Sequence, residues 1–124
     1  MIRVFVYGSL LSGLHNHGAL RDSVCIKKDE IAKGFLMFDI GNIPACIHTG
    51  KSWDVIMGEV YEVNKETFNR LDRLEGFPSF YDRIEYKMLE KPVWIYIHRK
   101  ISQIVPLVAS GDWREYYTQK QEAR

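Results

Sequence analysis

Residues 4–13 read VFVYGSLLSG, and this stretch decides how the first strand of the fold ends. Residues 2–7 are largely apolar on both alternating faces, which is typical of a strand in the middle of a sheet. The strand then meets a lone glycine, Gly8, between Tyr7 and Ser9, where a hairpin would carry Asn-Gly or Asp-Gly. The stretch therefore raises the hypothesis of a ligand-binding loop, with a tight turn beside a buried tyrosine as the alternative.

The composition limits the class of protein. A chain of 124 residues fits one domain, residues 1–124, and is long enough to bury a core. A hydrophobic content of 46% excludes a disordered chain, and a formal net charge of +1 argues against a nucleic-acid partner. No apolar run approaches the length of a membrane span, and no export signal precedes the first strand. We therefore expect a cytoplasmic, monomeric enzyme or binding domain.

Neither the cysteines nor the histidines form a recognisable metal motif. Cys25 and Cys46 are too far apart for a CxxC pair, and we expect both to be reduced. The four histidines are scattered along the chain and have no cysteine or carboxylate partner at ligand spacing. We predict no metal site and no organic cofactor.

The remaining pattern is dominated by strands and predicts an α+β fold. A helix over 65–74 follows Asn64, which can cap it, and Gly76 and Pro78 end it. A second helix is expected over about 110–121, whereas residues 10–31 read as a loop with a helical turn. About six consecutive strands favour a small, mostly antiparallel β-barrel. The expected strands are residues 2–7, 33–39, 43–48, 55–63, 81–89 and 93–98.

Glu75 stands at the end of the first predicted helix, where negative charge is disfavoured by the helix dipole. The apolar neighbours Phe77 and Phe80 would raise its pKa by desolvation. A carboxylate in such surroundings suits a general base. The alternative is a solvated glutamate that merely frays the end of the helix.

The loop of residues 7–10 has complementary features. The N–H groups of Gly8, Ser9 and Leu10 could converge on a carboxylate or a carbonyl oxygen of a ligand. The spacing is not that of a phosphate loop. Tyr7, Tyr81 and Tyr96 are further candidates, because each could donate its hydroxyl to a ligand; alternatively, all three are core aromatics.

These segments, taken in order, resemble one family. VFVYGSL at 4–10 is similar to the strand-plus-loop signature of the gamma-glutamylcyclotransferase-like proteins, a group that includes AIG2-like and gamma-glutamylamine cyclotransferase proteins. GEVYEV at 58–63 and LDRLEGFPSFYDR at 71–83 resemble its Gly-x-Val-Tyr strand and its helix-glutamate-loop-tyrosine segment. VWIYIH at 93–98 and SGDW at 110–113 resemble a later strand and the C-terminal element.

The resemblance implies a barrel with its site at the mouth, and it implies a reaction. The α-amino group of a γ-glutamyl substrate attacks its own γ-carbonyl, which forms 5-oxoproline and releases an amine or amino acid. Glu75 would be the base, and the loop of residues 7–10 would hold the glutamyl group. The identity of the leaving group stays open, because residues 11–31 and 41–54 carry no recognisable motif.

Two other classes of function stay open from the sequence. A non-catalytic barrel could bind a small molecule in the same pocket. A protein-interaction module could expose Trp94, Trp113 and the pair Tyr116 and Tyr117. Glu75 favours the enzyme, because a binding module does not need a carboxylate at an unfavourable helix end.

Overall fold

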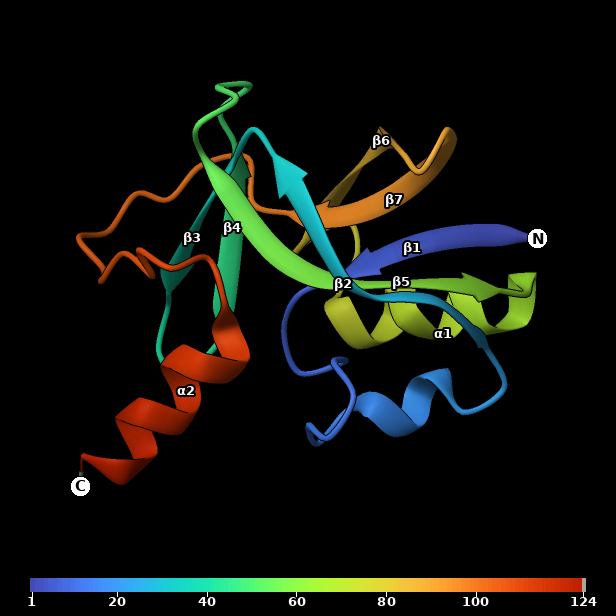
Figure 1. The fold of residues 1–124 in the computed structure, drawn as a ribbon, viewed down its shortest axis with the longest axis horizontal. Coiled ribbons are helices and arrows are strands. Elements are labelled where there is room, and N and C mark those ends of the chain that lie inside the picture. Colours follow the sequence, from blue (N-terminus) through green and yellow to red (C-terminus); the bar gives the residue numbers. More distant parts are fainter. Residues whose placement is uncertain (124) are drawn as a thin grey trace.

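The computed structural model describes residues 1–123 and has an α+β fold, as predicted. The secondary structure occurs in the following order (Figure 1): β1 (Ile2–Val6), a short 3-10 helix η1 (His17–Leu20), β2 (Val24–Lys33), β3 (Phe35–Asp39), β4 (Pro44–His48), β5 (Val55–Val63), α1 (Lys65–Glu75), β6 (Asp82–Met88), β7 (Lys91–Ile97) and α2 (Trp113–Glu122).

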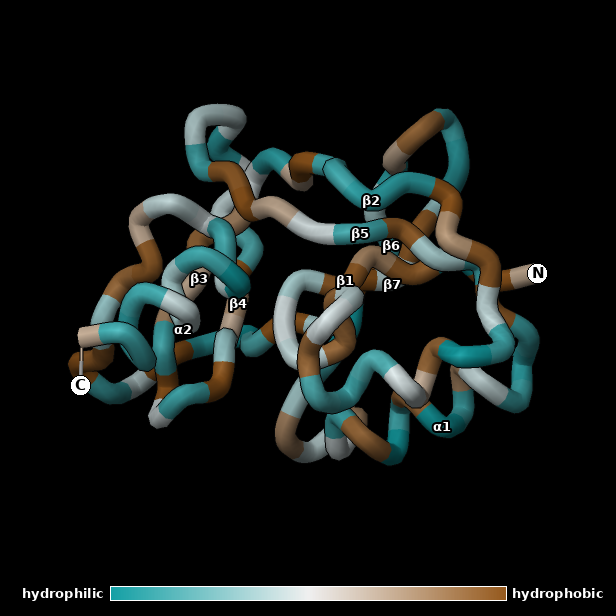
Figure 2. The backbone as a smooth tube through the Cα atoms, turned by 60° about the horizontal axis from the view of Figure 1, so that its bottom comes forward, coloured by the Kyte–Doolittle hydropathy of each residue, from teal (hydrophilic) through white to brown (hydrophobic). Residues whose placement is uncertain are grey.

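Strand β1 lies at the centre of a five-stranded sheet with the order β2-β5-β1-β7-β6. It pairs antiparallel with β5 and parallel with β7, so the sheet is mixed but mostly antiparallel. Val4 and Val6 face one hydrophobic cluster, and Phe5 and Tyr7 face the other. Because β1 is buried on both faces, its apolar residues do not alternate with polar ones. Figure 2 shows this hydrophobic centre around β1 and β7.

The strands do not close into a barrel, so that part of the sequence prediction is wrong. β3 and β4 form a separate two-stranded sheet. The chain leaves the larger sheet at Gly34, which has a φ of +95° and lies between β2 and β3. A hydrogen bond from the His98 N–H to the Cys46 carbonyl (2.8 Å) links the small sheet to the end of β7. The other edge of the small sheet binds residues 106–108.

Strand β2 was not expected, because residues 10–31 were predicted to be a loop. It lies at the edge of the sheet and most of its side chains are exposed, so the sequence has no alternation of apolar and polar residues. Its pairing with β5 also shifts register twice, between Cys25 and Lys27 and between Lys27 and Glu30. The helical turn expected in this region is present as η1.

Helix α1 begins and ends where the sequence predicts. The Asn64 side chain accepts a hydrogen bond from the Thr67 N–H (2.7 Å), and Gly76 ends the helix with a φ of +66°. Phe68 and Leu71 are buried against the sheet, whereas Leu74 is 45% exposed. Leu74 therefore lies outside the buried stripe of the helix.

Helix α2 is capped by Asp112, which accepts a hydrogen bond from the Glu115 N–H (3.2 Å). It lies beside the small β3–β4 sheet, far from α1 (Figure 1). Trp113 is buried in the cluster that contains Phe35 and Met37. Within residues 1–123, no helix has the length and apolar character needed to cross a bilayer.

Candidate active site

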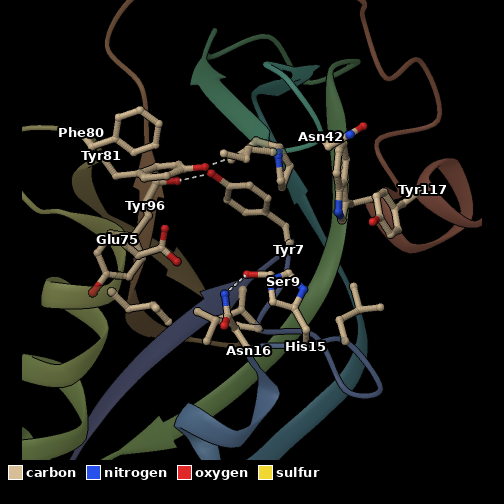
Figure 3. Close-up of a pocket in the computed structure, with 18 of the residues that line it drawn as sticks. Tyr7, Ser9, His15, Asn16, Asn42, Glu75, Phe80, Tyr81, Tyr96 and Tyr117 are labelled. Carbon is tan, nitrogen blue, oxygen red and sulfur yellow. Dashed lines mark hydrogen bonds between the residues drawn. The ribbon is translucent and has the colours of Figure 1, made fainter. Parts of the chain in front are cut away.

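A pocket of about 260 Å³ opens where β1 ends. Five segments far apart in the sequence form its walls: the end of β1 with the following loop, the start of β4 with the turn before it, the C-terminal end of α1 with the following loop, β7, and the first turns of α2 (Figure 3). The lining residues include all seven site residues that the sequence predicted: Tyr7, Gly8, Ser9, Leu10, Glu75, Tyr81 and Tyr96. The structure therefore places these residues together, and their roles remain predictions.

The loop after β1 is held from several sides. The Leu11 N–H donates to the Gly8 carbonyl (2.9 Å), and the Asn16 side chain donates to Ser9 Oγ (2.8 Å). His17 Nδ1 lies 2.9 Å from the Leu10 carbonyl oxygen. In the described chain, the peptide N–H groups of residues 8, 9 and 10 donate to no protein acceptor. They are therefore available to an anionic or carbonyl oxygen in the pocket.

Gly8 is required by packing. A Cβ atom at this position would lie 2.6 Å from Cγ of Pro44, which precedes the rest of β4. The backbone of the loop can approach the turn before β4 only because residue 8 has no side chain. The sequence predicts a ligand-binding loop at Gly8, and it gives no signal that Pro44 packs against this glycine.

Glu75 is the last residue of α1 and is half-buried, with its carboxylate in the pocket (Figure 3). Burial raises the pKa of its carboxyl from 4.5 to about 7. No hydrogen-bond donor or cation within the described residues offsets this effect of burial. Glu75 is therefore a carboxyl group that exchanges its proton near neutral pH.

The three tyrosines surround Glu75 and are all buried. Tyr7 donates its hydroxyl to the Tyr96 carbonyl (2.6 Å), and Tyr81 donates to the Pro44 carbonyl. Burial chiefly, together with the charge of Glu75, raises the pKa of all three hydroxyls. Each hydroxyl has already donated its one proton within the protein, so toward a ligand it is an acceptor.

Asp72 holds the end of α1 in place and is engaged with other residues. It accepts hydrogen bonds from Arg83 Nε (2.9 Å) and Nη2 (3.1 Å) and from the Tyr96 hydroxyl (2.7 Å). The Arg83 guanidinium in turn lies over the rings of Phe77 (4.0 Å) and Trp94 (4.5 Å).

Several lining residues were not predicted. Asn42, Ile43 and Pro44 lie at the start of β4 and in the turn before it, where the sequence carries no motif that indicates a site. Trp113 and Tyr117 lie four residues apart on one face of α2, and the sequence indicates them only under the alternative of a protein-interaction module. Trp113 is 3% exposed, which argues against that interpretation.

Comparison with known proteins gives the same family as the sequence motifs. The family described as "Gamma-glutamyl cyclotransferase, AIG2-like" matches residues 4–115. The chain belongs to this family. A Vibrio cholerae relative that carries the gamma-glutamylcyclotransferase name is 34% identical over 110 residues, which cover 89% of this chain and 93% of the relative.

Two further relatives of this AIG2-like protein bear on its chemistry and fold. The gamma-L-glutamyl-butirosin B gamma-glutamyl cyclotransferase of Niallia circulans is 28% identical, over 96% of this chain and 80% of its own. The crystal structure of PH0828 from Pyrococcus horikoshii has a TM-score of 0.81 at 24% identity and covers 98% of both chains. The last match establishes the fold alone. The family and the names of its members support an enzyme of the gamma-glutamylcyclotransferase type.

Proposed function

We propose that this protein converts a γ-glutamyl amide to 5-oxoproline. The α-amino nitrogen of the glutamyl group attacks its own γ-carbonyl carbon and forms the ring C–N bond. The bond from that carbon to the leaving nitrogen then breaks. Counted from the α-ammonium form of the substrate, two protons leave the attacking nitrogen and two reach the leaving nitrogen, which departs as an ammonium, so no external reactant is consumed.

The observation that carries the proposal is the presence of Glu75 and the open N–H groups of residues 8–10 in one pocket. The N–H groups can hold the α-carboxylate of the glutamyl group or the oxyanion that develops on the γ-carbonyl oxygen. The carboxylate of Glu75 can hold the α-ammonium group. A substrate fixed at both groups has its nucleophile close to its electrophile, which supplies much of the rate acceleration.

The raised pKa of Glu75 suits the proton transfers. An α-ammonium group cannot attack, so a base must first remove a proton from it. A carboxyl with a pKa of about 7 is a stronger base than an ordinary glutamate and is still largely ionised just above neutrality. After accepting this proton, it can donate it to the leaving amine as a general acid.

The experiment is to release 5-oxoproline from a panel of γ-glutamyl compounds with wild type and with Glu75→Gln. Because glutamine cannot take the proton, we expect kcat to fall by about two to four orders of magnitude. Binding of the γ-glutamyl compounds, measured by calorimetry, should persist, because the N–H groups of residues 8–10 are unchanged. Glu85→Gln, at an exposed position of β6, is the matched control and should turn over like wild type.

Two results would contradict parts of this proposal. Unchanged turnover in Glu75→Gln would remove Glu75 from the mechanism. An inactive wild type that still binds γ-glutamyl compounds would instead indicate a non-catalytic binding protein with the same fold.

A further inference from the structure

The pocket extends beyond the loop after β1, away from Glu75. In Figure 3, Tyr117 and Asn42 lie on the opposite side of Tyr7 and Ser9 from Glu75. We call this part the α2 end of the pocket and define it by Leu14, Ile43, Trp113 and Tyr117, all of which line the pocket. These four side chains are aliphatic or aromatic, and the neighbouring Asn42 adds one uncharged amide. The α2 end therefore offers an apolar surface to whatever extends past the glutamyl group.

The α2 end carries little charge. Among the described residues that line the whole pocket, the only titratable side chains besides the tyrosines are Glu75 and His15. No lysine, arginine or aspartate of the described chain lines the pocket. A charged group placed against the α2 end would lose water without gaining an ionic partner there, which is costly.

The two basic residues of α2 form ion pairs with buried carboxylates and do not line the pocket. Arg114 Nη2 lies 3.1 Å from the carboxylate of Glu59, and Lys120 Nζ lies 2.8 Å from that of Asp39. Both carboxylates are only 2% exposed. Removing either partner would leave a buried charge unpaired, so these two cations are not free to turn toward a ligand.

The same two ion pairs fix α2 in position. Glu59 also accepts hydrogen bonds from Ser12 N–H (2.9 Å) and Oγ (2.7 Å), which joins α2 to the loop after β1. Asp39 also accepts from the Tyr116 hydroxyl (2.7 Å) and from the Asn42 N–H (2.7 Å), which joins α2 to the turn before β4. The part of α2 that lines the pocket is therefore held between the loop after β1 and the turn before β4 before any ligand binds.

We propose that the α2 end of the pocket binds the leaving group, and that this protein prefers γ-glutamyl amides of uncharged, apolar or aromatic amines. The inference rests on the proposed function. With the α-amino and α-carboxylate groups held near Glu75 and residues 8–10, the γ-amide nitrogen and its substituent extend toward Trp113 and Tyr117. An apolar substituent gains burial there, whereas an ammonium or a carboxylate is desolvated without a partner.

The test compares three γ-glutamyl compounds of similar size whose leaving groups carry different charges: the amides of isoamylamine, of putrescine and of leucine. Isoamylamine is neutral once it is bound as an amide, putrescine adds an ammonium, and leucine is isoamylamine with a carboxylate. Release of 5-oxoproline gives kcat/KM, and calorimetry on Glu75→Gln gives the affinity without turnover. We expect the isoamyl amide to exceed each of the others by about tenfold or more in both measurements.

A negative charge introduced into the α2 end should reverse the preference for a neutral over a cationic leaving group. Tyr117→Glu adds a carboxylate to the α2 end, so the putrescine amide should gain about tenfold or more relative to the isoamyl amide. Thr118→Glu is the matched control, because it adds the same charge to an exposed position of the same helix outside the pocket. It should leave the order of the three compounds unchanged.

The outcomes separate this inference from the proposed function. Turnover of all three compounds at similar kcat/KM, or a preference for a charged one, would overturn the inference and keep the reaction. Tighter binding of the isoamyl amide without release of 5-oxoproline from any compound would overturn the reaction and support the subsite. Equal binding of all three by Glu75→Gln, or no binding at all, would overturn the subsite.

Discussion

Glu75 is the residue at which stability and the proposed chemistry conflict. It lies at the negative end of the helix dipole and is half-buried without a donor among the described residues. The charged form is therefore disfavoured, which raises the pKa of the carboxyl to about 7. The burial that makes the ionised form of Glu75 unfavourable for the fold also makes its carboxylate a base that is active near neutral pH.

This conflict predicts a stability change that depends on pH. Between about pH 4.5 and pH 7 the folded protein keeps a proton on Glu75 that the unfolded chain has released. The free energy of unfolding therefore falls as the pH rises through this range, by about 3 kcal/mol at most. Glu75→Gln cannot ionise, so it should be more stable than wild type at pH 8, by about 1–3 kcal/mol, and no more stable at pH 4.

Urea unfolding of both proteins at the two pH values measures the difference. An equal gain at pH 4 and pH 8 would mean that the charge of Glu75 is not the cause. Glu85→Gln, at an exposed position, controls for the loss of one negative charge from the whole molecule.

Gly8 illustrates how far a single residue can be interpreted from the sequence. Its position between Tyr7 and Ser9 predicts a ligand close to the backbone, which stays a prediction, whereas the close contact that the structure shows is made by another part of the chain. The approaching group is Pro44, which is distant in the sequence and carries no motif. A glycine indicates an empty space next to its Cα, but it does not indicate which residue fills that space.

Among the elements, those with a local cause were predictable. Helix α1 has a cap at Asn64, an apolar stripe and a stop at Gly76, all within its own sequence. Strand β2 has none of these signals, because an edge strand with exposed faces needs no apolar alternation. The separate β3–β4 sheet was also unpredictable, since strand ranges alone do not specify which edges pair.

The contact between the loop after β1 and α2 predicts a role for Glu59. This buried carboxylate holds Ser12 by two hydrogen bonds and Arg114 by an ion pair, and its hydrogen bonds keep its pKa low despite its burial. In Glu59→Gln, one oxygen is replaced by an NH₂ group that cannot accept. We expect KM for γ-glutamyl compounds to rise about tenfold, the effect of one lost charged hydrogen bond.

The kinetic profile separates positioning from catalysis. Because Glu75 is unchanged in Glu59→Gln, the midpoint of the acidic limb of kcat/KM against pH, which reports the free enzyme, should stay near 7. Asp39→Asn is the matched control, since Asp39 is equally buried and also binds α2, but does not touch Ser12. A similar rise in KM for the glutamyl group in Asp39→Asn would mean that general loosening of α2, rather than the loop after β1, is responsible.

At the scale of the whole molecule, the site depends on how closely β5 and β1 pack. Gly58 of β5 lies against the last residues of β1: a Cβ atom there would lie 2.2 Å from the Val6 carbonyl oxygen and 2.6 Å from the Phe5 ring. A glycine inside a strand is typical of a bulge or of a close approach by another part of the chain, and Gly58 is a case of close approach. Val6 leads directly into Tyr7 and the loop, so this contact helps to place the pocket wall.

We therefore predict that Gly58→Ala destabilises the whole fold by about 3 kcal/mol or more, because the clash is with backbone in the central strand and cannot be relieved by a side-chain rotation. Gly18→Ala is the control: its Cβ would meet no atom within 4 Å, and its φ is not in the left-handed range. It should change stability by less than about 1 kcal/mol. Urea unfolding of the three proteins at one pH gives the comparison.

A Gly58→Ala protein as stable as wild type would mean that β1 and β5 can separate without cost. The wall that carries residues 7–10 would then not be fixed by the sheet, and the hydrogen bonds from Ser12 to Glu59 would be its main support.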